Sequence, residues 1–195
     1  MREIKKHIFL ETISYENRHM SPRNLYIIRG EERSLMVDTS NNTERDWTIL
    51  KGMIDALGID CRKLDIFITH EHPDHTGLVP KLQLGARAFM NPDETRKRVD
   101  LLHSYLADER ARIENLRIVG GTKEETPEVY DTFMEYTTKA YASEKSPLEL
   151  SFIPIHPGDI LSYGGYHFEV KLLKGHTFGQ CGLYEPEKKL MFVGD

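Results

Sequence analysis

Apolar and polar residues alternate in short runs over most of the chain, and this period of two predicts β-strands. The clearest run is Leu64, Ile66 and Ile68, which predicts a strand over residues 64–69. A turn that contains Gly30 separates two further runs and predicts a β-hairpin. In the first half of the chain the predicted strands cover residues 2–14, 25–28, 35–37, 64–69 and 86–90.

The same alternation returns in the last quarter of the chain. Phe168, Val170 and Leu172 alternate with polar residues, and Pro157-Gly158 and Gly164-Gly165 mark turns. The predicted strands here cover residues 152–155, 160–162, 166–173, 182–184 and 189–193. The last four of these strands are predicted to form two hairpins.

A helical period replaces the alternation over residues 44–57. Thr43 and Asp46 resemble a capping pair at its start, and Gly58 suits its end. The apolar positions three or four residues apart are Trp47, Leu50, Ile54 and Leu57. A second, shorter helix is predicted over residues 76–84.

Residues 93–144 are charged and helical in pattern, and we interpret them as a helical insert. Two helices are predicted, over residues 94–117 and 124–142, divided by Gly120-Gly121. A solvated helical pair is the plain interpretation, and a lid over a site or a homodimer contact is the functional alternative. The whole order of strands and helices predicts an α+β fold, a mixed sheet sandwich with outer helices.

Composition limits the classes of partner. The chain has 195 residues, 39% of them hydrophobic and 29% charged, which predicts a single globular domain over residues 1–195. A net charge of −5 gives no general attraction to nucleic acid or to a membrane. We find no signal peptide or membrane-spanning run, and Cys61 and Cys181 are too few for a disulfide framework. We therefore expect a cytoplasmic protein that acts on a small molecule.

Three histidines and an aspartate lie close together directly after the predicted strand 64–69. The segment reads His70-Glu71-His72-Pro73-Asp74-His75. Residues two apart in an extended segment point the same way, so His70 and His72 can bind one cation. Pro73 bends the chain, after which Asp74 and His75 can face a second position. Imidazole and carboxylate are ligands of zinc and similar ions, and two such ions about 3.5–4 Å apart activate a shared water.

This segment resembles the signature of the metallo-β-lactamase superfamily, and three further segments agree with the family in order. Gly175-His176-Thr177 is similar to the family's Gly-His-Thr loop, and residues 192–195 are similar to its Gly-Asp segment. Asp38 matches an early aspartate that supports the metal loop. The resemblance covers the chain apart from the helical insert. It implies a four-layer αββα sandwich with the site at one edge, between the two sheets.

The resemblance also implies the ligands, and Asp74 would in addition position the nucleophile and assist proton transfer. Two divalent ions are expected, zinc first, with iron or manganese as alternatives. The family's last histidine, beyond the bridging aspartate, has no counterpart here, so we expect the fold to be C-terminally incomplete. The implied ligands are His70, His72 and His176 for the first metal, Asp74 and His75 for the second, and Asp195 as the bridge.

The function implied by the resemblance is a metal-dependent hydrolase. A metal-bound hydroxide would attack a small ester, thioester, lactone or phosphoester, as in glyoxalase II-like members. Penicillin hydrolysis and RNA processing fit less well, because the chain has no export signal and no basic stripe. The alternative from another class is an oxidoreductase of the persulfide dioxygenase type with one iron; a flavodiiron protein would have a carboxylate in place of His72. A fragment without catalysis is the third hypothesis.

Overall fold

The structure is a computed structural model, and it describes residues 1–14, 22–83, 85–94 and 151–195. The chain divides into two compact units: Met1–Glu94 with Leu150–Asp195, and Thr95–Glu149. Every described residue belongs to the first unit. From residue 95 onward the predicted helical insert lies outside the described residues, so the insert and the one-domain organisation stay predictions.

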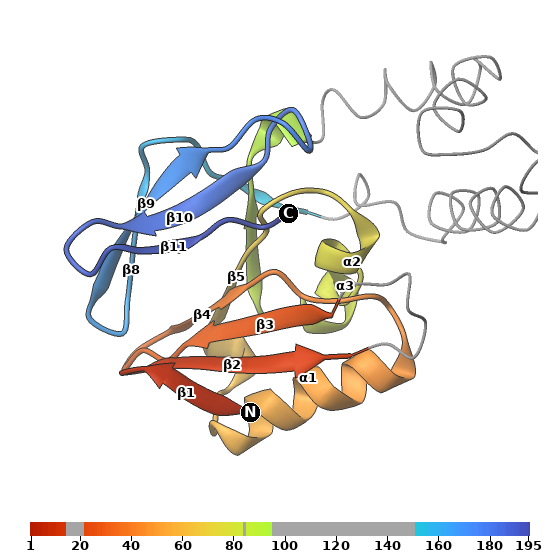
Figure 1. The fold of residues 1–195 in the computed structure, drawn as a ribbon. Helices are drawn as coiled ribbons and strands as arrows, with labels where there is room; N and C mark the ends of the chain where they lie inside the picture. The colour runs from red at the N-terminus through yellow and green to blue at the C-terminus, as the bar shows by residue number, and fades with distance from the viewer. Residues whose placement is uncertain (15–21, 84, 95–150) are drawn as a thin grey trace, which may run out of the picture. The chain divides into compact units, whose positions relative to one another are not determined.

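Two sheets form the framework of the described chain (Figure 1). In the larger sheet the strands follow chain order; the first four are antiparallel, and the later strands add in parallel from β4. Its strands are β1 (Arg2–Lys5), β2 (Ile8–Ile13), β3 (Arg23–Ile28), β4 (Ser34–Val37), β5 (Leu64–Phe67), β6 (Arg87–Met90) and β7 (Ile153–Pro154). The smaller sheet is antiparallel and contains β8 (Ile160–Tyr163), β9 (Tyr166–Leu172), β10 (Cys181–Glu185) and β11 (Leu190–Phe192).

Several short helical elements and one longer helix lie between β4 and β6 in the sequence. They are α1 (Glu44–Ala56), the 3-10 turn η1 (Cys61–Lys63), α2 (Pro73–Thr76) and α3 (Val79–Leu82). α1 confirms the helix predicted over residues 44–57. At its start the Thr43 hydroxyl accepts a 3.1 Å hydrogen bond from the N–H of Asp46, and after its end Gly58 has a left-handed φ of 64°. None of the helices in these ranges is long and apolar enough to cross a membrane.

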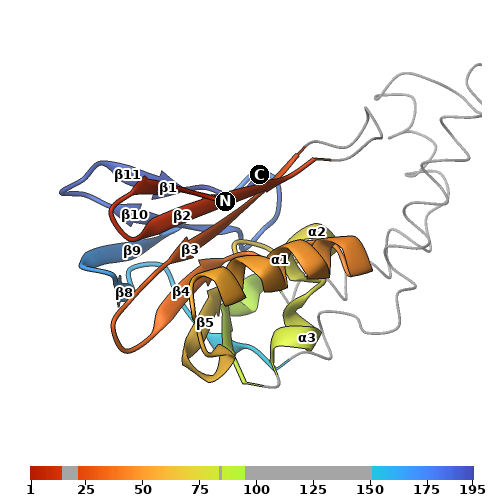
Figure 2. The ribbon, with the colours of Figure 1, turned by 90° about the horizontal axis from the view of Figure 1, so that it is seen from below.

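Apolar side chains form two cores, one on each face of the larger sheet. Leu25 and Ile27 of β3 pack in the core that includes Leu50 of α1. Ile28, next in the same strand, packs in the other core with Phe168 of β9. Figure 2 shows α1 and α3 on one side of the larger sheet and β8–β11 on the other. The α+β sandwich is therefore confirmed, with a helix layer and both sheets inside the described ranges; an outer helix layer on β8–β11 is not represented there.

Two predicted elements were wrong in detail. Residues 2–14 form two antiparallel strands, β1 and β2, because His7 adopts a left-handed φ of 65° and turns the chain back. Of the predicted helix 76–84, Thr76 is the last residue of α2, Gly77 and Leu78 lie outside both helices, and Val79–Leu82 form α3. Pro80 lies in the first turn of α3, and a proline there has no N–H to continue the hydrogen bonds of a preceding helix.

The parallel strands bring the functional segments to one edge of the larger sheet. Val37 at the end of β4 pairs with Phe67 at the end of β5. Asp38 follows β4 directly, and the histidine-rich segment follows β5. In sheets flanked by helices, sites form at such carboxyl ends of adjacent strands.

Candidate metal centre

Three imidazoles from two distant segments meet at the end of β5. His70 follows β5, His72 precedes α2, and His176 lies in the loop between β9 and β10. The Nδ1 of His72 is 3.1 Å from the Nε2 of His70 and 2.9 Å from the Nε2 of His176. Two nitrogens bound to one tetrahedral zinc at ~2.0–2.1 Å lie about 3.3 Å apart. These three residues, which we call the first triad, thus have the spacing of ligands to a single ion.

A second triad shares one histidine with the first. It consists of His70, His75 and Asp195, whose ligand atoms lie within 4.8 Å of one another. The Nε2 of His75 is 3.3 Å from Oδ1 of Asp195, yet it is buried without a hydrogen bond to any described residue. A buried imidazole nitrogen that makes no hydrogen bond and faces a carboxylate fits a metal ligand. The donors of both triads therefore fit divalent metal ions.

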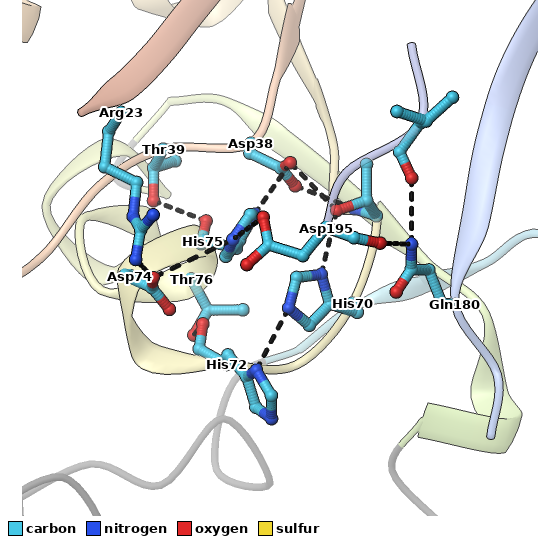
Figure 3. A network of polar contacts seen from close by, with 12 residues as sticks. Arg23, Asp38, Thr39, His70, His72, Asp74, His75, Thr76, Gln180 and Asp195 are labelled. Carbon is cyan, nitrogen blue, oxygen red and sulfur yellow. Dashed lines mark hydrogen bonds and ion pairs between the residues drawn. The ribbon is translucent and has the colours of Figure 1, made fainter. Parts of the chain in front are cut away.

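Asp38 connects β4 to the second triad (Figure 3). Its Oδ1 accepts a 2.8 Å hydrogen bond from the backbone N–H of Thr69, and its Oδ2 accepts one of 2.8 Å from the Thr69 hydroxyl. The same Oδ2 lies 2.9 Å from Nδ1 of His75. With Nδ1 turned to Asp38, Nε2 of His75 is directed to the site, which is the usual arrangement behind a metal-bound histidine.

Burial keeps His70 and His72 of the first triad uncharged. It lowers the pKa of His70 to about 2, helped by the neighbouring histidines, chiefly His75. Burial and the adjacent His176 lower the pKa of His72 to about 4. Both imidazoles are therefore neutral near pH 7, and a neutral imidazole has the lone pair that a metal requires.

Two members of the second triad, His75 and Asp195, are charged instead. Burial by itself would lower the pKa of His75, but the carboxylates of Asp38 and Asp195 raise it to about 10. The contact with His75 in turn holds the pKa of Asp195 far below its usual range. In the metal-free protein His75 is thus a cation between carboxylates, and a metal there would replace its Nε2 proton.

Asp74, the other predicted ligand of the second metal, lies beside the second triad. Among the described residues it joins neither triad, although its Oδ2 lies 3.9 Å from Nε2 of His75. That oxygen instead accepts a hydrogen bond from Nη2 of Arg23, the first residue of β3. Arg23 was not predicted as a site residue, because a single arginine before a strand carries no sequence signal.

Two further residues outside the motifs hold the site together. Glu94, at the end of the described segment after β6, binds both loops that carry the first triad. Gln180, in the loop before β10, donates from Nε2 to the carbonyl oxygens of Val193 (2.8 Å) and Asp195 (2.7 Å). Neither residue lies in a predicted ligand position, and no spacing rule singles them out.

A cavity of about 430 Å³ opens beside the second triad. Its polar wall contains Arg23, Asp74, His75 and Asp195, and its apolar wall includes Tyr26 and Phe192. A volume of this size is typical of small-molecule sites. The arrangement can therefore hold metal ions at one side of a pocket that admits a small substrate.

Comparison with known proteins agrees with this geometry. A solved metallo-beta-lactamase family protein from Thermus thermophilus superposes with a TM-score of 0.70 and 25% identity, over 99% of this chain and 60% of that one. An uncharacterized protein of Aquifex aeolicus is 26% identical over 138 residues, which are 70% of this chain and 50% of that protein. The chain thus spans little more than half the length of these two proteins.

Two shorter matches concern named proteins. Hydroxyacylglutathione hydrolase GloC of Haemophilus influenzae is 50% identical over 38 residues, which are 20% of this chain and 18% of that protein. A putative diflavin flavoprotein of Nostoc sp. is 44% identical over 68 residues, 33% of this chain and 11% of that protein. The family model described as the metallo-beta-lactamase superfamily matches residues 20–195. The chain belongs to the metallo-beta-lactamase superfamily.

Proposed function

We propose that this chain carries the metal centre of a hydrolase that acts on small ester, thioester, lactone or phosphoester substrates. The convergence of three imidazole nitrogens in the first triad carries the proposal. Membership of a superfamily that includes hydrolases supports it. The second triad and the adjoining cavity supply a place for a second ion and for the substrate.

Each residue has a role in this proposal. His70, His72 and His176 would hold the first ion, and His75 and Asp195, with Asp74 beside them, would hold the second. When bound, such ions polarise a carbonyl or phosphoryl oxygen and lower the pKa of water to about 7. Asp38 keeps Nε2 of His75 directed to the site, and Asp74 would orient the attacking water and take up its proton.

Among the candidate substrates we favour a thioester. GloC, which matches the chain over a short segment, is named for the hydrolysis of a hydroxyacyl glutathione, which is an acyl–sulfur ester. The cavity of about 430 Å³ has room for a small acyl group beside the second triad. Its apolar wall, with Tyr26 and Phe192, suits the hydrocarbon part of such a group.

A second candidate is a mononuclear iron oxidoreductase of the persulfide dioxygenase type. The donors of the second triad, two imidazoles and one carboxylate, favour it. This donor set is typical of non-haem Fe(II) oxygenases. Under this alternative one iron would bind His70, His75 and Asp195, and the substrate would be oxidised rather than hydrolysed.

Metal content and turnover separate the two candidates. The purified chain is loaded with zinc or with Fe(II), its metal content is measured by mass spectrometry, and it is assayed with thioesters, lactones, phosphodiesters and a persulfide. Zinc-dependent hydrolysis supports the proposal, whereas one iron per chain with persulfide oxidation supports the alternative. A zinc-loaded chain that hydrolyses none of these substrates would contradict the hydrolase proposal.

A variant pair tests the ligand assignment. We expect His72→Ala to lose zinc and activity together, because it removes the nitrogen that lies between the other two of the first triad. His167→Ala is the matched control, since His167 is exposed on β9 and contacts the hydroxyl of Ser162. Full zinc occupancy in His72→Ala would contradict the assignment.

A further inference from the structure

Arg23 places a positive charge at the edge of the second triad. Its guanidinium lines the cavity together with Asp74, His75 and Asp195. Nη2 of Arg23 donates to Oδ2 of Asp74 in a pair whose side chains are only 19% and 7% exposed. Figure 3 shows this guanidinium over the carboxylate of Asp74, on the side away from His72.

The contact uses the oxygen that a second ion would need. Oδ2 of Asp74 is the atom that lies 3.9 Å from Nε2 of His75, a predicted ligand of the second metal. While Arg23 holds this oxygen, Asp74 gives less negative charge to an ion beside His75. Asp74 accordingly joins neither triad within the described ranges.

Among the described residues, Asp74 is the hydrogen-bond partner of the Arg23 guanidinium. Its Nε is buried there without a hydrogen-bond partner, so the described contact that holds the group is the one to Asp74. Asp195 of the second triad lines the same cavity as Arg23 and Asp74, so the positive charge faces both carboxylates. A fixed cation that acts on two carboxylates of one site repels a metal ion bound there.

We propose that Arg23 sets the affinity of the second metal position, which makes the second triad the weaker of the two sites and lets the first triad load first. The first triad consists of three imidazoles and contains no carboxylate for Arg23 to engage. Arg23 is thus a positioning residue, which acts on the second ion through Asp74. This inference rests on the proposed metal centre but not on any hydrolytic activity.

Zinc titration of the full chain tests it. Binding is measured in competition with a chromophoric chelator, which yields two dissociation constants, and Arg23→Gln is compared with the wild type. Glutamine keeps an N–H donor for Asp74 but removes the charge, so we expect the second dissociation constant to fall about tenfold or more while the first is unchanged. Arg23→Lys, which keeps the charge, should behave like the wild type.

The controls separate this effect from general changes of charge or fold. Arg62→Gln removes an arginine from an exposed pair with Asp60 and should change neither constant. Arg23→Met, a second neutral variant, gives the same comparison if the glutamine variant folds poorly. An unchanged or weaker second site in Arg23→Gln, with two zinc ions bound to the wild type, would overturn the inference alone. No zinc binding to any variant would overturn the proposed function, and the inference with it.

Discussion

The carboxylate of Glu94 accepts a 2.6 Å hydrogen bond from the backbone N–H of Gly179. The hydroxyl of Thr177 donates to the same oxygen over 2.8 Å, and the backbone N–H of Glu71 donates to the other oxygen over 2.9 Å. Glu71 lies between two histidines of the first triad, and Thr177 follows the third. One carboxylate, 3% exposed, therefore joins the two loops that bring the first triad together.

The first prediction concerns this junction. Glu94→Gln places an amide donor opposite a backbone N–H, which leaves buried groups unsatisfied at a cost of about 1–3 kcal/mol. We expect a lower free energy of unfolding by about that amount, and zinc affinity at the first triad reduced about tenfold. Urea unfolding and chelator competition measure the two effects. Glu44→Gln is the control, because Glu44 is 89% exposed, and unchanged zinc affinity in Glu94→Gln would disprove the role.

A second prediction compares two glycines. A Cβ at Gly77 would lie 2.6 Å from the carbonyl oxygens of both Pro73 and Ser40 and 2.7 Å from the nitrogen of Asn42. These are backbone atoms, so Gly77→Ala must displace either α2 or the loop after β4. A Cβ at Gly52 in α1 would meet nothing within 4 Å. We therefore expect Gly77→Ala to lower the melting temperature strongly. Gly52→Ala should raise the free energy of unfolding by about 0.5–1 kcal/mol, and the melting temperature should rise slightly with it. Equal melting temperatures for the two variants would contradict this packing.

The elements that could be predicted from sequence are those with local signals. The helix over residues 44–57 has both an apolar period and a Thr43 cap, and the structure contains both. The turn at His7 could not be predicted, since a left-handed φ is uncommon for any residue other than glycine and the β1–β2 pairing stabilises it here. Pro80 was a visible signal against one continuous helix over residues 76–84.

The site likewise contains residues that the sequence indicates and residues that it does not. The histidines of the first triad belong to short motifs, so their types and spacing indicate a metal. The contacts of Arg23 and Glu94 depend on segments that lie 51 and 85 residues away in the sequence. Only the sheet topology brings these segments together, and arginine and glutamate are common residues. A single sequence therefore predicts the types of metal ligand well. It does not predict the residues that position the ligand loops or that repel the metal ion.

A third prediction concerns Asp65, which connects the two sheets. Its buried carboxylate accepts hydrogen bonds from Arg33 (2.7 Å), Arg87 (2.6 Å) and the hydroxyl of Tyr163 in β8 (2.6 Å). Burial raises its pKa, but these donors outweigh burial and hold the pKa well below the usual range. We expect Asp65→Asn to lower the free energy of unfolding at pH 7 by about 2 kcal/mol, less than for a fully buried pair because both arginines are partly exposed.

The pH dependence follows from the direction of this shift. A depressed pKa adds stability above the unfolded carboxylate pKa of about 3.9, and this stability is lost as the pH falls toward the folded value. The difference between wild type and Asp65→Asn in urea unfolding should therefore shrink below about pH 4. Asp60→Asn, at an exposed pair with Arg62, should show little difference at any pH. A constant difference for Asp65→Asn across this pH range would be inconsistent with the pairing.

The last prediction distinguishes the two metal positions through Asp38. Its Oδ2 lies 2.9 Å from Nδ1 of His75, so when a metal replaces the Nε2 proton the remaining ring proton is held on Nδ1 and Nε2 is directed to the second triad. The Asp38→Asn variant can keep the backbone, because asparagine tolerates the left-handed φ of 57° found here. The new amide, however, would present a donor to Nδ1 and favour the tautomer with the proton on Nε2.

We expect Asp38→Asn to weaken the second zinc site about 10–100-fold and leave the first unchanged. Two-site zinc titration checks this against Asp159→Asn, an exposed control, and equal loss at both sites would mean that Asp38 supports the loop rather than the tautomer of His75.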